Sequence, residues 1–405
     1  MSNGILAGLR VVEAAAFVAA PLGGMTLAQM GADVIRIDPL HGGLDHRRWP
    51  VTADDTSLFW CGLNKAKRSV ALDLASAEGR EIAMALACAP GEDAGLFLTN
   101  FPARGWLAHE ALRARRPDLI QLTLTGDRHG GSAVDYTVNA RLGLPHMTGP
   151  VDAEGVVNHV LPAWDLITGQ MVAVGLLAAE RHRRRTGEGQ HVKLALEDVA
   201  LAVMQHLGFI AEAQQGQPRE RHGNALFGAF GRDFMTADGE RVMVVGLTLK
   251  QWRSLVEATG CAEAVAALAR QRGVDLDREG ERFRAREELA ALIGPWIAAR
   301  PVAEVAAAFQ QHGVCWSRYQ DVAALARDPE CSPANPLFTR TAQPGVGEML
   351  LAGLPLDFGA APRQPARPAP QLGADTEAVL AEVLGIDAAG FGRLHDRGVV
   401  RQAAG

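Results

Sequence analysis

One carboxylate in the sequence stands out because a long uncharged stretch comes after it. Asp165 ends the run Pro162-Ala163-Trp164-Asp165, and the next charged residue is Glu180. The apolar stretch between them predicts a long helix from about Asp165 to Arg184. A helix N-terminus carries unpaired N–H groups and partial positive charge, which hold a carboxylate ionised. An ionised aspartate can attack an activated acyl group and form a covalent intermediate, although the spacing alone also fits a plain helix cap.

Other familiar chemistries have no matching pattern. The sequence contains no GxxxxGK[ST] loop, no GxGxxG run after the first predicted strand, no GxSxG elbow and no HExxH motif. The five cysteines lie too far apart for a CxxC zinc pair. Their odd number fits a reducing compartment, so we expect a cytoplasmic protein. We expect neither a metal nor a redox cofactor.

The composition is that of an ordinary globular protein. The chain has 405 residues, of which 48% are hydrophobic and 21% are charged. Its 40 basic and 46 acidic residues give a net charge of −6, which argues against nucleic acid as the main partner. No uncharged apolar stretch of about 18 residues predicts a membrane helix. The first six residues have no basic region followed by an apolar run, so we expect no secretory signal.

Strands and helices are predicted to alternate through the first half of the chain. The predicted strands are 9–13, 33–37, 69–74, 94–100, 119–124 and 190–196. The predicted helices are 21–30, 76–87, 106–115, 165–184 and 198–213. This alternation is typical of βαβ units and predicts an α/β fold with a parallel sheet.

The second half begins after a polar segment. Residues 214–221 contain both Gly and Pro and predict a linker. Residues 234–245 then predict a β-hairpin with Asp238-Gly239 in its turn, and helical stretches follow up to Gln311. Residues 361–370 are rich in proline and predict an extended connector. Two short helices are predicted near the C-terminus, from 375 to 384 and around Phe391.

Several motifs in order resemble the family III coenzyme A transferases. They are GLRVVE at 8–13, GADVIRI at 31–37, KRSVALDL at 67–74, Asn100-Phe101, Asp165 and TGEGQ at 186–190. The resemblance covers the whole chain. It implies a Rossmann-like large domain that the C-terminal segment completes, a smaller inserted α+β domain, and an interlocked homodimer. The implied divisions are 1–213 for the first part of the large domain, 214–224 for the linker, 225–330 for the small domain, 331–371 for the return connector and 372–405 for the C-terminal part of the large domain.

A narrower resemblance concerns the reaction. GLNKAKRS at 62–69, FPARGW at 101–106, VDYTVN at 134–139, NHVLPAWD at 158–165 and LHDRGVV at 394–400 are similar to family members that move CoA between the two carboxyls of one unsaturated dicarboxylic acid. This implies an acyl-CoA substrate and a covalent anhydride and thioester on Asp165. CoA is then part of the substrate. An intermolecular transferase acting between a dicarboxylic acyl-CoA and a free acid remains the alternative, as does an acyl-CoA-binding protein without activity.

The resemblance also implies residues that contact CoA. They are Phe17, Val18, Arg36, Lys67, Arg68, Leu72, Asn100, Phe101 and Arg104. Ligands of open α/β sheets bind at the carboxyl ends of the strands, which independently favours Phe17, Arg36 and Asn100. The cationic side chains would meet the nucleotide phosphates, whereas Phe17 and Leu72 could equally be ordinary core.

A released carboxylate needs a cationic partner. Arg47 and Arg48 follow the Gly-rich run His41-Gly42-Gly43-Leu44-Asp45 and are candidates for that role, and Arg104 is another. Each could equally be a solvated surface arginine.

The sequence departs from the family pattern at two positions. Racemase-type members have a histidine before the acidic residue that corresponds to Asp135, but this chain has Val134, so we expect no two-base epimerisation. After the hairpin of the small domain, some members have a glycine-rich loop. Here Gly246 is the single glycine before Lys250.

Overall fold

The computed structural model describes residues 4–403. Residues 1–3 and 404–405 lie outside the described residues. The first three belong to the segment in which we expect no secretory signal, and the last two belong to the predicted C-terminal part of the large domain. The packing divides the chain into two compact units. The first contains the chain up to Leu142, Val160–Ala211 and the chain from Asp328 onward, and the second contains Gly143–His159 and Glu212–Arg327.

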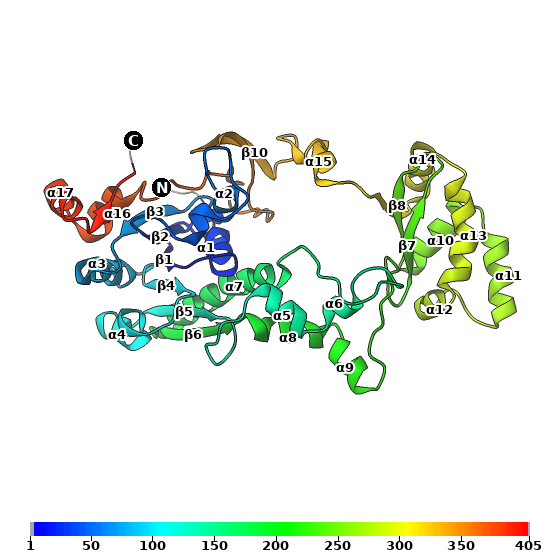
Figure 1. The fold of residues 1–405 in the computed structure, drawn as a ribbon, viewed down its shortest axis with the longest axis horizontal. Helices are drawn as coiled ribbons and strands as arrows, with labels where there is room; N and C mark the ends of the chain where they lie inside the picture. The colour runs from blue at the N-terminus through cyan, green and yellow to red at the C-terminus, as the bar shows by residue number, and fades with distance from the viewer. Residues whose placement is uncertain (1–3, 404–405) are drawn as a thin grey trace. The chain divides into compact units, whose positions relative to one another are not determined.

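The first unit is built on a seven-stranded sheet with the order β12-β3-β2-β1-β4-β5-β6 (Figure 1). Its strands are β1 (Arg10–Ala14), β2 (Asp33–Pro39), β3 (Arg68–Leu72), β4 (Leu96–Thr99), β5 (Ile120–Thr125), β6 (Gln190–Ala195) and β12 (Val400–Arg401). All neighbouring pairs are parallel except β12 with β3. The predicted α/β fold with a parallel sheet is therefore confirmed.

Helices cover both faces of this sheet. The helices of this unit include α1 (Ala19–Gln29), α2 (Leu58–Leu63), α3 (Ala77–Ala87), α4 (His109–Arg115), α5 (Asp135–Arg141), α7 (Ala163–Thr186), α8 (Leu196–His206), α16 (Thr376–Leu384) and α17 (Ala388–Asp396), with short 3₁₀ turns η1 (Leu44–Arg47), η2 (Gly105–Leu107) and η3 (Pro329–Cys331). Alternate strand residues face opposite sides. Val11 and Leu122 pack with α1 and α7 in one core, while Val12 and Phe97 pack with α3, α4, α16 and α17 in the other.

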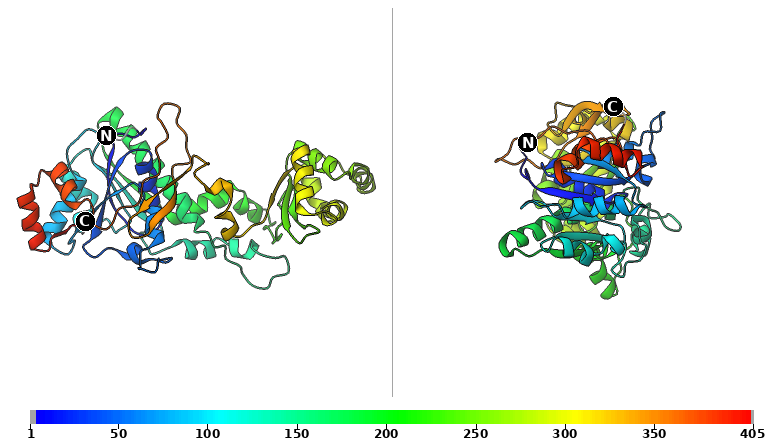
Figure 2. Two further views of the ribbon diagram at one scale, coloured as in Figure 1. Left: turned by 90° about the horizontal axis from the view of Figure 1, so that it is seen from above. Right: turned by 90° about the vertical axis from the view of Figure 1, so that its left-hand side faces the viewer.

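The C-terminal helices lie beside the N-terminal strands, as both views in Figure 2 show. Thr376 at the start of α16 accepts a hydrogen bond from the Ala71 amide of β3. A separate hairpin, β10 (Phe338–Gln343) with β11 (Gly347–Ala352), belongs to the same unit. We predicted neither this hairpin nor α2, because both lie in segments whose pattern indicates loop or connector.

Local chemistry explains where most helices begin and end. Ser76 accepts a hydrogen bond from the Gly79 amide and caps α3 as predicted. The predicted helix 198–213 is wrong as a single element. Gly208 has a positive φ of 82° and separates α8 from α9 (Phe209–Gln214). A glycine adopts this left-handed conformation at little cost, and a helix cannot continue through it.

The second unit pairs a small antiparallel sheet with helices. The sheet has the order β7 (Phe230–Met235), β8 (Arg241–Gly246) and β9 (Cys315–Arg318), so the predicted hairpin is confirmed. The helices of this unit are α6 (Leu144–Met147), α10 (Leu249–Ala258), α11 (Ala262–Arg272), α12 (Glu279–Arg284), α13 (Arg286–Ala298), α14 (Val302–His312) and α15 (Val322–Leu325). Phe230, Trp252 and Ile293 lie in its core.

No single helix among the described residues is long and apolar enough to cross a membrane. Taken together, the bent pair of α13 and α14 reaches the required length and composition.

Close packing of α1 on α7 positions the start of α7. A Cβ on Gly169 would lie 2.9 Å from the Ala19 carbonyl oxygen and 2.8 Å from a Leu22 methyl group, and a Cβ on Gly23 would collide with Val172. These glycines let the two helices approach closely. Asp165 is one turn before Gly169, so it lies at the N-terminal end of α7, near the loop that joins β1 to α1.

Candidate active site

Asp165 is the third residue of α7 and is half-buried. Within residues 4–403 its carboxylate oxygens accept no hydrogen bond. The cap of α7 is supplied instead by Asp135, the first residue of α5. Asp135 Oδ2 accepts hydrogen bonds from the amides of Trp164 (2.7 Å) and Asp165 (3.1 Å). The alternative in which Asp165 is a plain cap is therefore wrong, since another carboxylate already fills that role.

The environment of Asp165 opposes its ionisation. Burial and, next, the negative charge of Asp135 raise the pKa of Asp165 to about 7, and the positive charge of Arg48 only partly offsets them. Our expectation that the helix N-terminus keeps this carboxylate ionised is therefore wrong. The amides of Trp164 and Asp165 are already bonded to Asp135. Once ionised, Asp165 is a more basic carboxylate than an ordinary aspartate.

Arg48 is the cation beside Asp165. Its guanidinium lies 4.8 Å from the centre of the Phe59 ring and 5.8 Å from that of Phe17. Among the described residues it forms no ion pair, so its charge is available to a ligand. The structure thus brings together Asp165, Arg48 and Phe17 from three separate segments of the chain. Arg47, the neighbouring candidate, is exposed.

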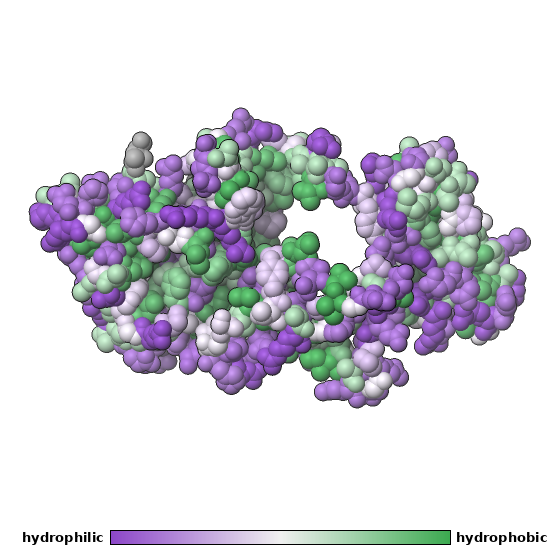
Figure 3. Space-filling view, viewed as in Figure 1, coloured by the Kyte–Doolittle hydropathy of each residue, from purple (hydrophilic) through white to green (hydrophobic). Residues whose placement is uncertain are grey.

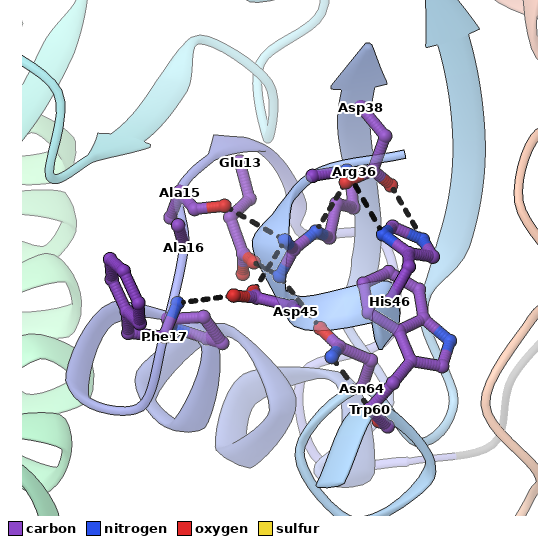
Figure 4. Close-up of polar contacts among 12 residues, drawn as sticks. Glu13, Ala15, Ala16, Phe17, Arg36, Asp38, Asp45, His46, Trp60 and Asn64 are labelled. Atoms are coloured by element: carbon purple, nitrogen blue, oxygen red, sulfur yellow. Dashed lines mark hydrogen bonds and ion pairs between the residues drawn. The ribbon is translucent and has the colours of Figure 1, made fainter. Parts of the chain in front are cut away.

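The loop after β1 is held by side chains from three directions, several of which Figure 4 shows. Arg36 Nη2 donates to the carbonyl oxygen of Ala15 at 2.8 Å. Asn100 accepts from the Ala16 amide at 3.0 Å and donates to the Ala16 carbonyl oxygen at 2.8 Å. Asp45 Oδ1 accepts from the Phe17 amide at 2.8 Å. Three consecutive residues, Ala15 to Phe17, are therefore fixed.

These contacts hold Phe17 in an unusual conformation. Its φ is +70°, a value that costs a residue with a Cβ roughly 1–2 kcal/mol. Phe17 remains 41% exposed, and the Arg48 guanidinium lies over its ring. Such strain is typical of functional sites. Phe17 is thus free to contact a ligand, whereas the Asn100 amide is occupied by the loop and Val18 is buried.

Arg36 is the centre of a buried ion cluster. The side chain is 1% exposed and donates to Asp38, Asp45 and Asn64 at 2.9–3.0 Å, with Glu13 at 3.3 Å. We call Glu13, Arg36, Asp38, Asp45, Asn64 and Lys67 the Arg36 cluster. Lys67 Nζ donates to Glu13, Asn64 and the Pro21 carbonyl oxygen at 2.8–2.9 Å, which uses its three donors. Phosphate binding by the Arg36 and Lys67 side chains is therefore not supported, because both are committed to protein partners.

Two more predicted CoA contacts lie elsewhere. Arg68 begins β3, at the end of the sheet opposite to the carboxyl ends of the strands, and pairs with Asp33 (2.6 Å) and Glu382 (2.8 Å). Leu72 is fully buried in the core under α3 and α16. The structure brings neither side chain to the loop at Phe17, and their contact with CoA stays a prediction.

The remaining predicted contacts follow β4. Phe101 and Arg104 are both exposed at the carboxyl end of the sheet, and Arg104 forms no ion pair within the described residues. Both stay predictions. No group of three or more His, Cys, Asp or Glu side chains suited to a metal ion occurs in the described part of the chain.

Sequence reasoning missed two residues that shape the site. Asp135 was noted as a family position but not as the cap of α7, and Asp45 was seen only as part of a Gly-rich run. The available signal for Asp135 was its place in the motif at 134–139, since no helix was predicted to begin there. Nothing in the sequence paired Asp45 with the Phe17 amide, since that contact joins segments 28 residues apart.

Comparisons with known proteins agree with this architecture. The family model described as CoA-transferase family III matches residues 6–376. The chain belongs to this family and is therefore a CoA-transferring enzyme. It is 62% identical over 401 residues to 2-methylfumaryl-CoA isomerase of Chloroflexus aurantiacus, covering 98% of each chain. It is 31% identical over 389 residues to succinyl-CoA:mesaconate CoA-transferase of Haloarcula hispanica, covering 91% of this chain and 94% of the relative.

A solved structure shares the fold. A CAIB/BAIF family protein from Brucella suis aligns with a TM-score of 0.75 and 26% identity, covering 94% of this chain and all of the other.

Proposed function

We propose that the protein is an intramolecular CoA transferase that moves CoA from the C1 to the C4 carboxyl of mesaconate, a 2-methylfumaryl-CoA isomerase. The observation that carries the chemistry is the half-buried Asp165 carboxylate, free of hydrogen bonds among the described residues and close to the unpaired Arg48. The substrate rests on the 62% identity to the Chloroflexus isomerase over 98% of both chains.

The first half of the reaction loads CoA onto the protein. The Asp165 carboxylate attacks the C1 thioester, the carbon–sulfur bond breaks, and CoA leaves as its thiolate. The product is a mixed anhydride between Asp165 and mesaconate. The thiolate then attacks the aspartyl carbonyl of that anhydride, which gives an aspartyl-CoA thioester and releases the mesaconate carboxylate.

The second half reverses these steps at the other carboxyl. Mesaconate turns over within the pocket, and its C4 carboxylate attacks the aspartyl thioester. A second anhydride forms and the thiolate leaves again. The thiolate attacks C4, so mesaconyl-C4-CoA forms and Asp165 regains its carboxylate. The two carboxyls are trans across a double bond and cannot readily close a ring, which is why an external shuttle residue is needed.

Retention of mesaconate decides the efficiency of this cycle. Holding the free diacid beside the aspartyl thioester makes the second half effectively unimolecular. Arg48 is the side chain best placed to hold the released carboxylate, with Arg47 and Arg104 as further candidates. Phe17 and Phe101 would contact CoA. We propose no metal or redox cofactor, since every step is nucleophilic acyl transfer.

We also propose that the protein works as a cytoplasmic homodimer, interlocked as the family resemblance implies. The support is a set of exposed apolar side chains in the first unit. Ile167, Met171 and Val174 recur along α7, and Val160, Leu161 and Leu207 accompany them. Figure 3 shows hydrophobic side chains exposed on this unit. Apolar surface of this kind usually marks an interface.

The test uses the purified wild-type protein with mesaconyl-C1-CoA and no added acid. The two regioisomers are separated by chromatography and identified by mass spectrometry. A second, parallel reaction contains isotopically labelled free mesaconate as a trap. We expect the C4 isomer to form without label, and Asp165→Ala to abolish its formation.

The other outcomes separate the alternatives. Conversion only with an added acid, with label in the product, would make the protein an intermolecular transferase like the Haloarcula relative. Absence of any conversion, with the thioester still bound, would leave an acyl-CoA-binding protein.

A further inference from the structure

Asp135 is the most unusual side chain near the site that the mechanism does not use. It is 1% exposed, and its Oδ2 atom alone accepts the hydrogen bonds from the backbone amides of Trp164 and Asp165. Its other oxygen, Oδ1, is buried without a hydrogen-bond partner. Leaving a buried carboxylate oxygen without a partner is costly. A carboxylate whose only task was to cap α7 could be replaced there by a neutral residue at lower cost.

Two side chains of α5 form hydrogen bonds with the first turn of α7. Asp135 and Asn139 lie one turn apart on α5, so they share a face. Asp135 holds the backbone of Trp164 and Asp165, and Asn139 Oδ1 accepts from the Trp164 indole N–H at 3.3 Å. The position of the Asp165 backbone is therefore set by α5 as well as by its own helix.

We propose that Asp135 is the positioning residue of this site: its buried carboxylate fixes the backbone of Trp164 and Asp165 and places a negative charge near the Asp165 side chain. This proposal rests on the proposed function, in which Asp165 carries the acyl group and then CoA. The charged side chains that act on Asp165 from the elements around it are Asp135 on α5 and Arg48 after η1. Arg48 opposes the effect of Asp135.

The basicity of Asp165 decides which way the mixed anhydride breaks. A thiolate can attack either carbonyl of the anhydride, and the carboxylate on the other side then leaves. The less basic carboxylate leaves more readily. If Asp165 is the more basic of the two, mesaconate leaves, and CoA is transferred to the protein. If Asp165 were an ordinary aspartate, attack would more often return the starting thioester. The negative charge of Asp135 thus favours transfer of CoA to the protein in the first half of the cycle. It opposes the last step, in which Asp165 must leave as the thiolate attacks C4, so Asp135 raises the fraction of protein that carries covalent CoA.

The test removes the charge of Asp135 while keeping a hydrogen-bond acceptor. Asp135→Asn is isosteric and Asp135→Ser is smaller, and both residues can still cap a helix. Asp135→Glu retains the charge at a changed distance. Asp387→Asn, a matched cap change at α17, where Asp387 accepts from the Gly390 amide at 2.7 Å, is the control. Folding of each variant is checked by circular dichroism.

Two readouts report the charge rather than the fold. In Asp135→Asn and Asp135→Ser, we expect the acid limb of log kcat/KM against pH to move about one unit lower, because a neighbouring negative charge has been removed. The fraction of protein that carries covalent CoA after mixing with mesaconyl-CoA, measured by intact-protein mass spectrometry, should fall about tenfold. Asp135→Glu should keep the acid limb near that of the wild type, and Asp387→Asn should change neither readout.

The failures of the two proposals are distinguishable. If the wild type carries covalent CoA on Asp165 but the charge-removing variants have an unmoved acid limb and an unchanged covalent fraction, the role of Asp135 is wrong and the proposed function stands. The role of Asp135 is also wrong if Asp135→Glu shifts the limb as Asp135→Asn does, since shape would then matter and charge would not. If the wild type never carries covalent CoA, the proposed function itself is wrong.

Discussion

Two groups of charged side chains lie at the same edge of the sheet and differ in burial and in ion pairing. The Arg36 cluster is buried, its two cations face three carboxylates, and nearly every donor has a partner. Asp165 and Arg48 are only half-buried, and neither forms an ion pair within the described residues. The first group fixes the backbone of the loop after β1, whereas the second has unused charge that a substrate can meet.

The difference shows that charged side chains at one edge of the sheet have two roles: some stabilise the fold and others remain available for the reaction. Charges that are fully paired inside the protein have no capacity left for a ligand. A carboxylate left unpaired beside another carboxylate is costly to ionise, and that cost makes it reactive. We therefore expect substitutions in the Arg36 cluster to affect folding first, and substitutions at Asp165 and Arg48 to affect turnover first.

The largest effect on stability is expected for Arg36→Met. Removing the guanidinium leaves Glu13, Asp38 and Asp45 buried with Lys67 as the remaining cation, which should destabilise the first unit by about 3–5 kcal/mol. Thermal melts followed by circular dichroism measure the effect. The control is Arg115→Met, which removes an exposed ion pair with Glu81 and should cost less than about 1 kcal/mol. Equal losses in the two variants would contradict the assignment of the cluster as structural.

Asp165→Asn should make the protein more stable at pH 8 while abolishing turnover. The pKa of Asp165 is raised from 3.8 to about 7, so ionisation above pH 7 costs the folded state at most about 4 kcal/mol. A group with a raised folded-state pKa contributes stability at low pH and loses it as the pH rises to that value. The gain from Asn should therefore be absent near pH 4 and full above pH 7. Melting temperatures of both proteins across this range check it, and a constant difference would contradict it.

Arg48→Gln should weaken the reaction more than Arg47→Gln. Arg48 lies near the rings of Phe17 and Phe59, and its charge acts on Asp165, so its loss removes a charged partner of the released carboxylate. We expect kcat/KM to fall about 10- to 100-fold, or roughly 1.4–2.8 kcal/mol. Escape of labelled mesaconate should rise in parallel. A larger loss for Arg47→Gln would transfer the role to that residue.

The smallest effect is expected for Arg68→Gln. Its ion pairs with Asp33 and Glu382 lie at the far end of the sheet and are partly exposed, so stability should change by less than about 1 kcal/mol. The KM for the acyl-CoA should not change. A tenfold rise in KM would support a contact between Arg68 and CoA, as the family resemblance implies.

The sequence predicted the sheet well because its strands are short apolar runs between amphipathic helices. It predicted Asp165 because this carboxylate precedes a long apolar helix and stands at a position of the family motifs; the spacing alone also fitted a plain cap. It did not predict β10 and β11, which form a separate two-stranded sheet with each other. It did not predict the protein partners of Arg36, Lys67 and Arg68 or the burial of Leu72, because motif position does not report which way a side chain points or which groups it contacts.

The sequence by itself indicated the family and the parallel sheet, and it predicted Asp165 as the reactive carboxylate. Those properties depend on residue order and on periodicity along one chain. The tertiary structure decided which charges stabilise the fold and which remain for chemistry. Arg36 meets Glu13 and Asp45, and Asp135 meets the start of α7, only after the chain folds. Electrostatic effects depend on the distance between charges and on their burial, and the spacing of residues along the chain gives neither.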